Sequence, residues 1–270
     1  MRKRQWLIGA LSIAVMWLLA AGPAGAQAQS GTVKMEWLSW SIFRFTSPTG
    51  KVVLTNPFVE NPDSPVKVED FPKVDVILVA DGHADEVGSA AEIALKSGAK
   101  IVSTWEMWSA YFEPRKVPAA QILRSNPGDW NKFDGITIRN VNSVHGSGTP
   151  EKMYGGAAMG FIIHFENGLT VYFAGSTALT MDMRLWGSLY KPDVAILPLS
   201  GGRDPQDIVH MVRFLQTDNP NLKTVIPHHH RLKSPQGAPT PADMEKALKA
   251  AGLPVKVLDP ELGRVYELTK

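Results

Sequence analysis

The sequence predicts an α/β fold in which two mixed sheets form an αββα sandwich with helices on the outer faces. Two sections rich in β-like segments are each followed by alternating strand and helix patterns, the order expected for such layers. The composition agrees, because 44% hydrophobic and 20% charged residues without any cysteine exclude disordered, collagen-like and disulfide-stapled proteins. No linker, charge block or internal repeat interrupts the chain after its N-terminal segment, so we predict one domain over residues 29–270.

The first section combines short strands with two helices. Clusters of turn residues separate apolar segments that are long enough for strands. The strands are expected over residues 33–38, 41–46, 51–55, 74–80 and 101–104. The helices are expected over residues 87–96, with Gly98 as the stop, and over residues 105–112.

The second section repeats this order. The pair Asn167-Gly168 between two apolar segments is a strong signal for a β-hairpin. The strands are expected over residues 136–144, 160–165, 169–174, 194–199 and 224–226. The helices are expected over residues 205–215 and 241–251.

The N-terminal segment has the pattern of a secretory signal peptide over residues 1–28. Arg2, Lys3 and Arg4 precede an apolar run over residues 6–21, and small residues that suit cleavage follow it. The alternative is an uncleaved anchor, but the run is shorter than the roughly 20 apolar residues that cross a bilayer. The sequence therefore predicts a periplasmic or secreted protein with no membrane span after cleavage.

Removal of this segment also changes the charge balance. The 28 basic residues fall to 25 without the three in the signal peptide, against 26 acidic residues, so the net charge becomes −1. This balance argues against a nucleic-acid partner and leaves a small-molecule substrate as the expected one. The absence of cysteine means that any metal site must use histidine and carboxylate ligands.

The segment Asp81-x-His83-x-Asp85-Glu86 places four potential metal ligands between a predicted strand and a predicted helix. The same residues have an ordinary alternative, because acidic side chains in a first helical turn stabilise the helix without any metal. His145 ends another predicted strand in a glycine-rich loop, where a single histidine is more often surface than ligand.

Three adjacent histidines, at residues 228–230, follow the predicted strand that ends before Pro227. Packing alone rarely explains three imidazoles at a strand end, although an exposed loop remains an alternative. The residues do not decide which of the three would bind a metal ion. The position two residues after Pro227 makes His229 the expected one.

Taken in chain order, these segments resemble the metallo-β-lactamase superfamily of hydrolases. The resemblance is greatest to the branch of ascorbate-6-phosphate lactonase and the phospholipase-D-like metal-dependent hydrolases, and it covers nearly all of the mature chain. The motifs that carry it are Asp81-x-His83-x-Asp85-Glu86, His145-Gly146, Ala174-Gly175-Ser176-Thr177 and Pro227-x-His229. The resemblance implies the αββα fold and hydrolysis of an ester, lactone or phosphoester.

The sequence departs from the family pattern at five site positions. The family signature His-x-His-x-Asp-His has Asp81 for its first histidine and Glu86 for its last. Ser176 stands in place of a bridging aspartate, Asn56 in place of the aspartate before Pro-Phe, and Trp40 in place of a histidine in the first hairpin.

The resemblance implies one or two divalent metal ions, with Zn, Mn or Fe as the expected metals. A first ion would use Asp81, His83 and His145. A second ion would use Asp85, Glu86 and His229. Loss of the bridging aspartate and gain of terminal carboxylates favour Mn²⁺, Fe²⁺ or Mg²⁺ over Zn²⁺ more than in the family, and make a single retained ion plausible.

The expected function is an exported hydrolase with a metal-activated water at a carboxylate-rich site, where Asp85 orients the water. The main alternative is a degenerate member without catalysis that acts as a periplasmic binding or accessory protein, because five site positions are substituted. A third alternative is redox chemistry at a di-iron site, which the absence of a flavin or haem module disfavours. The substrate and the oligomeric state do not follow from the sequence.

Overall fold

The computed structural model describes residues 31–199, 203–233 and 235–270. The predicted signal peptide lies outside the described residues. Within the described ranges, every helix is too short or too polar to cross a membrane.

Seven strands of the described chain form the first sheet, in the order β14-β1-β2-β3-β4-β5-β6. The pairs from β14 to β3 are antiparallel, and those from β3 to β6 are parallel. The strands are β1 (Val33–Trp37), β2 (Phe43–Thr46), β3 (Val52–Thr55), β4 (Val76–Leu78), β5 (Lys100–Ser103), β6 (Ile122–Arg124) and β14 (Val265–Leu268).

The second sheet has the same mixed construction, in the order β13-β12-β11-β10-β9-β8-β7. Its strands are antiparallel from β7 to β10 and parallel from β10 to β13. They are β7 (Trp130–Phe133), β8 (Ile136–Asn142), β9 (Met159–His164), β10 (Thr170–Phe173), β11 (Val194–Pro198), β12 (Thr224–His228) and β13 (Lys256–Val257).

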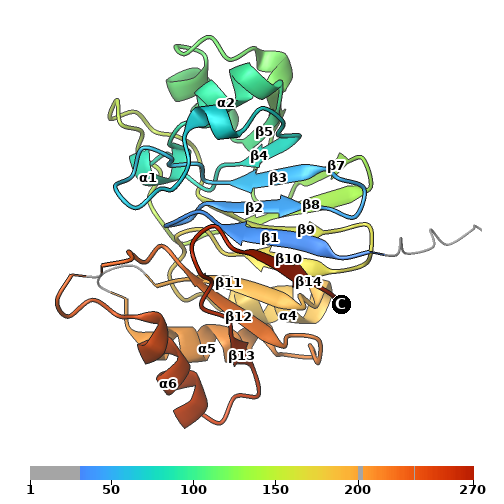
Figure 1. Cartoon of the computed structure of the whole chain (residues 1–270), viewed down its shortest axis with the longest axis vertical. Coiled ribbons are helices and arrows are strands. Elements are labelled where there is room, and N and C mark those ends of the chain that lie inside the picture. Colours follow the sequence, from blue (N-terminus) through green and yellow to red (C-terminus); the bar gives the residue numbers. More distant parts are fainter. Residues whose placement is uncertain (1–30, 200–202, 234) are drawn as a thin grey trace, which may run out of the picture.

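Helices cover the outer face of each sheet. The helices are α1 (Ala84–Val87), α2 (Ala90–Ser97), α3 (Trp105–Met107), the π-helical η2 (Trp108–Phe112), α4 (Asp182–Tyr190), α5 (Pro205–Leu215) and α6 (Pro241–Ala250). Two short 3-10 turns, η1 (Val68–Asp70) and η3 (Ala119–Gln121), join strands of the first sheet. Figure 1 shows α4, α5 and α6 together beside β11, β12 and β13, with α2 beside β4 and β5.

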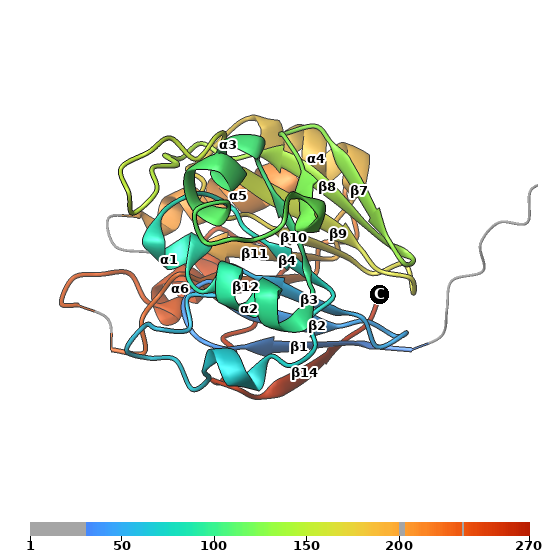
Figure 2. The same cartoon turned by 90° about the horizontal axis from the view of Figure 1, so that it is seen from above.

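Three apolar cores hold these layers together. The central core joins side chains of both sheets, and Figure 2 shows β14, β1, β2 and β3 in one layer with β7, β8, β9 and β10 in another. A second core lies between the first sheet and α2, and a third between the second sheet and α4, α5 and α6. The αββα sandwich predicted from the sequence is therefore confirmed.

The helix predicted over residues 87–96 begins only at Ala90, as α2, because the chain bends at Gly88 after the separate short helix α1. This residue has a φ of 41°, and a Cβ there would lie 2.5 Å from the Cα of Phe58. Only glycine avoids both the strained backbone and the clash. The break ends α1 soon after Glu86 and so fixes the direction of the short turn that carries Asp85 and Glu86.

Candidate metal centre

The candidate ligands follow strands of both sheets at the same edge of the sandwich. Asp81 and His83 follow β4, His145 follows β8, and His229 follows β12. Active sites of α/β folds collect at such edges, because parallel strands end there together. The structure brings all six predicted residues to this edge, in two groups of different geometry.

The first group consists of Asp81, His83 and His145. One potential ligand atom from each lies within 4.8 Å of the others. The two imidazole rings meet edge to face, with their centroids 5.0 Å apart. We call these three residues the ligand group.

A tight turn holds the first two members of the ligand group. The Oδ1 atom of Asp81 accepts hydrogen bonds from the backbone N–H of His83 at 2.9 Å and faces its Nδ1 atom at 3.0 Å. A Cβ on the intervening Gly82 would lie 3.0 Å from the Cε atom of Met107 and 3.1 Å from the carbonyl oxygen of Ser147. The turn therefore needs glycine at this position, because a larger residue would push the loop away from its neighbours.

The ligand group suits a metal ion. Asp81 is 2% exposed, and its Oδ2 atom is buried without a hydrogen-bond partner among the described residues. A buried carboxylate oxygen without a partner is costly, and a bound cation would remove that cost. One carboxylate and two imidazoles, with a fourth position left for water, form a donor set that Zn²⁺ and Fe²⁺ both accept in enzymes.

The two histidines of the ligand group differ in their electrostatics. The hydrogen bond to Asp81 raises the pKa of His83, against the opposing effect of burial. Partial desolvation lowers the pKa of His145, with the Asp81 carboxylate acting in the opposite direction. Because a histidine binds metal in its neutral form, metal uptake at His83 releases a proton whenever that ring starts out protonated.

The second group consists of Asp85, Glu86 and His229, with the imidazole between the two carboxylates. Its Nε2 atom lies 3.1 Å from Oδ2 of Asp85, and its Nδ1 atom lies 3.1 Å from Oε1 of Glu86. The side chain of Asp85 is 32% exposed, whereas that of Glu86 is 1% exposed. We call these three residues the clamp.

Three polar residues donate hydrogen bonds to Glu86. Ser176 donates its hydroxyl to Oε1 at 2.5 Å, Ser41 donates to the same oxygen at 3.4 Å, and the amide of Asn56 donates to Oε2. Asn56 is itself fixed, because its Oδ1 atom accepts the backbone N–H of Ala80 at 2.9 Å. Both oxygens of the buried carboxylate therefore have protein donors.

In the clamp, His229 shifts the pKa of both carboxylates, and both carboxylates shift the pKa of His229. Burial lowers the pKa of His229, but the hydrogen bonds and charges of Asp85 and Glu86 outweigh it and raise that pKa to about 10. Burial raises the pKa of Glu86, and His229 only partly offsets this. For Asp85, the hydrogen bond and charge of His229 outweigh burial and lower the pKa. In the metal-free chain His229 is therefore a cation at neutral pH.

The neighbours of His229 face elsewhere. His228 is fully buried, with its ring centroid 5.0 Å from that of Phe173, and burial holds its pKa well below the usual range. His230 stacks on Trp37 at 4.7 Å, and burial lowers its pKa to about 4. Of the three adjacent histidines, His229 is therefore the one that contacts Asp85 and Glu86, the two residues with which it was grouped from the sequence.

Two residues at the site were not among the candidates from the sequence. Ser41 donates to Glu86 and lies 2.8 Å from Nδ1 of His229. Arg203 donates from Nη2 to the backbone carbonyl of Ser176 at 2.5 Å. A serine and an arginine in polar loops carry no local signal of such contacts, so nothing in the sequence could have identified them.

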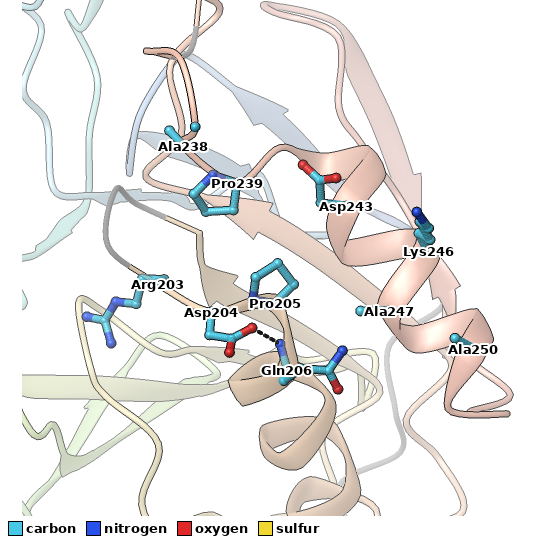
Figure 3. A pocket seen from close by; sticks show the side chains of 11 residues that line it. Arg203, Asp204, Pro205, Gln206, Ala238, Pro239, Asp243, Lys246, Ala247 and Ala250 are labelled. Carbon is cyan, nitrogen blue, oxygen red and sulfur yellow. Dashed lines mark hydrogen bonds between the residues drawn. The ribbon is translucent and has the colours of Figure 1, made fainter.

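Arg203 also lines a pocket of 660 Å³ between the starts of α5 and α6 (Figure 3). The two acidic residues of its lining are engaged in helix caps: Asp204 accepts from the N–H of Gln206, and Asp243 accepts from Thr240. The exposed Lys246 adds a second cation to the lining. The pocket therefore combines two basic and two acidic side chains next to the loop that carries Ser176.

Comparison with known proteins gives a consistent result. A family model described as a β-lactamase superfamily domain matches residues 51–252. A metal-dependent hydrolase of Rubrobacter xylanophilus is 33% identical over 86% of this chain and 95% of its own length. One from Pyrococcus abyssi is 34% identical over 87% of this chain and its full length.

Solved structures agree with these relatives. Igni18, a metallo hydrolase of Ignicoccus hospitalis, superposes with a TM-score of 0.74 at 28% identity, over 89% of this chain and all of that one. An isothiocyanate hydrolase from Delia radicum gut bacteria has the same fold, with a TM-score of 0.66 at 20% identity, over 86% of this chain and 98% of that one.

Proposed function

Because the chain belongs to the metallo-β-lactamase superfamily of metal-dependent hydrolases, we propose that it is an exported hydrolase of an ester, lactone or phosphoester with a metal ion at the ligand group. The observation that carries this proposal is the clustering of Asp81, His83 and His145, together with the buried and unpartnered Oδ2 atom of Asp81. A cation is the simplest partner for that oxygen, and the donor set is one that leaves a position for water.

A divalent ion held by Asp81, His83 and His145 would supply a water of lowered pKa and polarise the bond to be cleaved. The chain's own contribution beside it is Asp85. Its carboxylate is partly exposed, and its lowered pKa keeps it ionised at neutral pH, so it accepts a hydrogen bond from water and orients it. The Nε2 atom of His229 holds that carboxylate in place from the other side.

The test uses the mature chain, residues 29–270, purified without chelators. Metal content is measured by mass spectrometry, and turnover is measured on a panel of carboxylic esters, lactones and phosphodiesters with Zn²⁺, Mn²⁺ and Fe²⁺. We expect bound metal and turnover that the double variant His83→Ala/His145→Ala loses, while His210→Ala on the exposed face of α5 keeps both. A native chain without bound metal would contradict the proposal.

Export is tested separately. We expect the full chain to be processed near residue 28 and recovered from the periplasm or the medium. Replacing Arg2, Lys3 and Arg4 by glutamate should leave the precursor uncleaved, because the positively charged N-terminus is part of the export signal. Recovery of unprocessed native chain in the cytoplasm would contradict this part of the proposal.

One observation favours a second candidate, a binding or accessory protein without turnover. The residues at three substituted family positions bind one another, because Asn56 and Ser176 each donate a hydrogen bond to Glu86. The same panel separates the two candidates. Metal binding with no turnover under any condition, together with tight binding of one panel compound, would favour the second.

A further inference from the structure

The clamp has a geometry that does not suit a metal ion. The ring of His229 presents Nε2 to Asp85 and Nδ1 to Glu86, each at 3.1 Å. The lone pairs of the two ring nitrogens point away from different edges of the ring, so one ion can take only one of them. An ion at Nε2 would have Asp85 beside it, but Glu86 would lie on the opposite side of the imidazole.

Glu86 is also occupied by the protein. Ser41 and Ser176 donate to Oε1, and Asn56 donates to Oε2. Redirecting this carboxylate to an ion would take the acceptor away from the amide of the fully buried Asn56, and Ser41 and Ser176 would keep only Nδ1 of His229 within reach. The cost of such orphaned donors is substantial in the protein interior.

The ligand group shows the opposite arrangement. Its Asp81 has a buried oxygen with no partner in the described chain, and one potential ligand atom from each of its three residues lies within 4.8 Å of the others. The two groups share the loop over residues 81–86 but make opposite use of their carboxylates.

We propose that the protein binds one divalent ion, at Asp81, His83 and His145, and that Asp85, Glu86 and His229 form a metal-free clamp where a second ion would otherwise sit. The clamp positions Asp85 through a continuous chain of contacts from Asn56 and Ser176 through Glu86 and His229. This inference rests on the proposed function, because it presumes an ion at the ligand group.

The experiment counts metal ions in the mature chain. The native protein and the variants Glu86→Gln and His229→Asn are dialysed against ZnCl₂ or MnCl₂, and bound metal per chain is measured by mass spectrometry. Asparagine suits position 229 because His229 has a φ of 64°, a region that asparagine enters more readily than most residues. Circular dichroism shows whether each variant is folded, and His210→Ala is the control for a histidine outside the site.

We expect one equivalent in the native chain, in Glu86→Gln and in His229→Asn, and none in His83→Ala/His145→Ala. In the Mn²⁺-loaded native chain, electron paramagnetic resonance should show the spectrum of an isolated ion without coupling to a second. Two equivalents in the native chain, or loss of the single equivalent in folded Glu86→Gln, would overturn the inference and leave the proposed function intact. No metal in the native chain would overturn both.

Discussion

The ligand group and the clamp have similar compositions but different surroundings. Each combines histidine and carboxylate, and each takes residues from the loop over 81–86. In the ligand group the buried Oδ2 atom of Asp81 has no partner in the described chain. In the clamp, by contrast, both oxygens of Glu86 accept hydrogen bonds from the protein. This difference indicates that the hydrogen-bond donors around a carboxylate decide whether it is available to a metal ion. The presence of the carboxylate in a motif does not decide it.

The largest effect should come from the ligand group. Replacing His83 or His145 by alanine removes one of the three protein ligands in the ligand group. We therefore expect the affinity for the metal ion to fall more than about 100-fold, beyond the 10–100-fold loss that is typical when a residue hydrogen-bonded to a ligand is replaced. Competition with a chromophoric chelator measures the change. Equal losses in His229→Asn would remove the distinction between the two groups.

Truncation of Glu86 should give the next largest effect, on stability instead of metal binding. Glu86→Ala removes one of the two carboxylates that face His229 and the oxygens to which Asn56 and Ser176 donate. Breaking such a buried pair costs about 3–5 kcal/mol. Urea unfolding of chelator-treated protein measures the free energy of unfolding. The matched control is Glu261→Ala, whose exposed pair with Arg264 should contribute less than about 1 kcal/mol.

Asn56→Asp should destabilise the metal-free chain by a smaller amount, about 1–3 kcal/mol. The substitution keeps an oxygen for the N–H of Ala80 but turns the donor to Glu86 into a second carboxylate. Urea unfolding with and without Zn²⁺ measures the loss. If Zn²⁺ restored the full stability of Asn56→Asp and a second equivalent of metal were bound, the clamp position would accept an ion once the amide is removed. A metal-free chain as stable as the native one would contradict the role of Asn56.

The last prediction concerns the pH dependence of the stability of the metal-free chain. The folded pKa of His229 is raised to about 10 from an ordinary value of 6.5, so its protonation stabilises the fold fully below about pH 6.5. This contribution decreases as the pH rises and is lost through about pH 10. The difference in urea midpoint between the native chain and His229→Asn should therefore narrow from pH 6.5 to pH 10. A difference that is constant over this range would contradict a charged clamp.

Much of the fold could be predicted because its signals are local. The expected helix over residues 205–215 is α5 with the same bounds, since Asp204 caps it and Pro205 begins it. The hairpin at Asn167-Gly168 joins β9 and β10 as expected. By contrast, β6, β7, β13, β14 and α4 were not predicted. Three residues of β6 and two of β13 are too few for a pattern, and β7 and β14 mix exposed with partly buried positions.

The sequence by itself determined the family, the sandwich and the six candidate ligands, because hydrophobic periodicity, turn residues and motif order are properties of short segments. Only the tertiary structure divided those six residues into a ligand group and a clamp. The contacts that make the division join Glu86 to Asn56, Ser176 and His229, which lie 30 to 143 residues away along the chain. Whether a buried oxygen has a donor depends on which loops the fold brings beside it, and no local pattern contains that information.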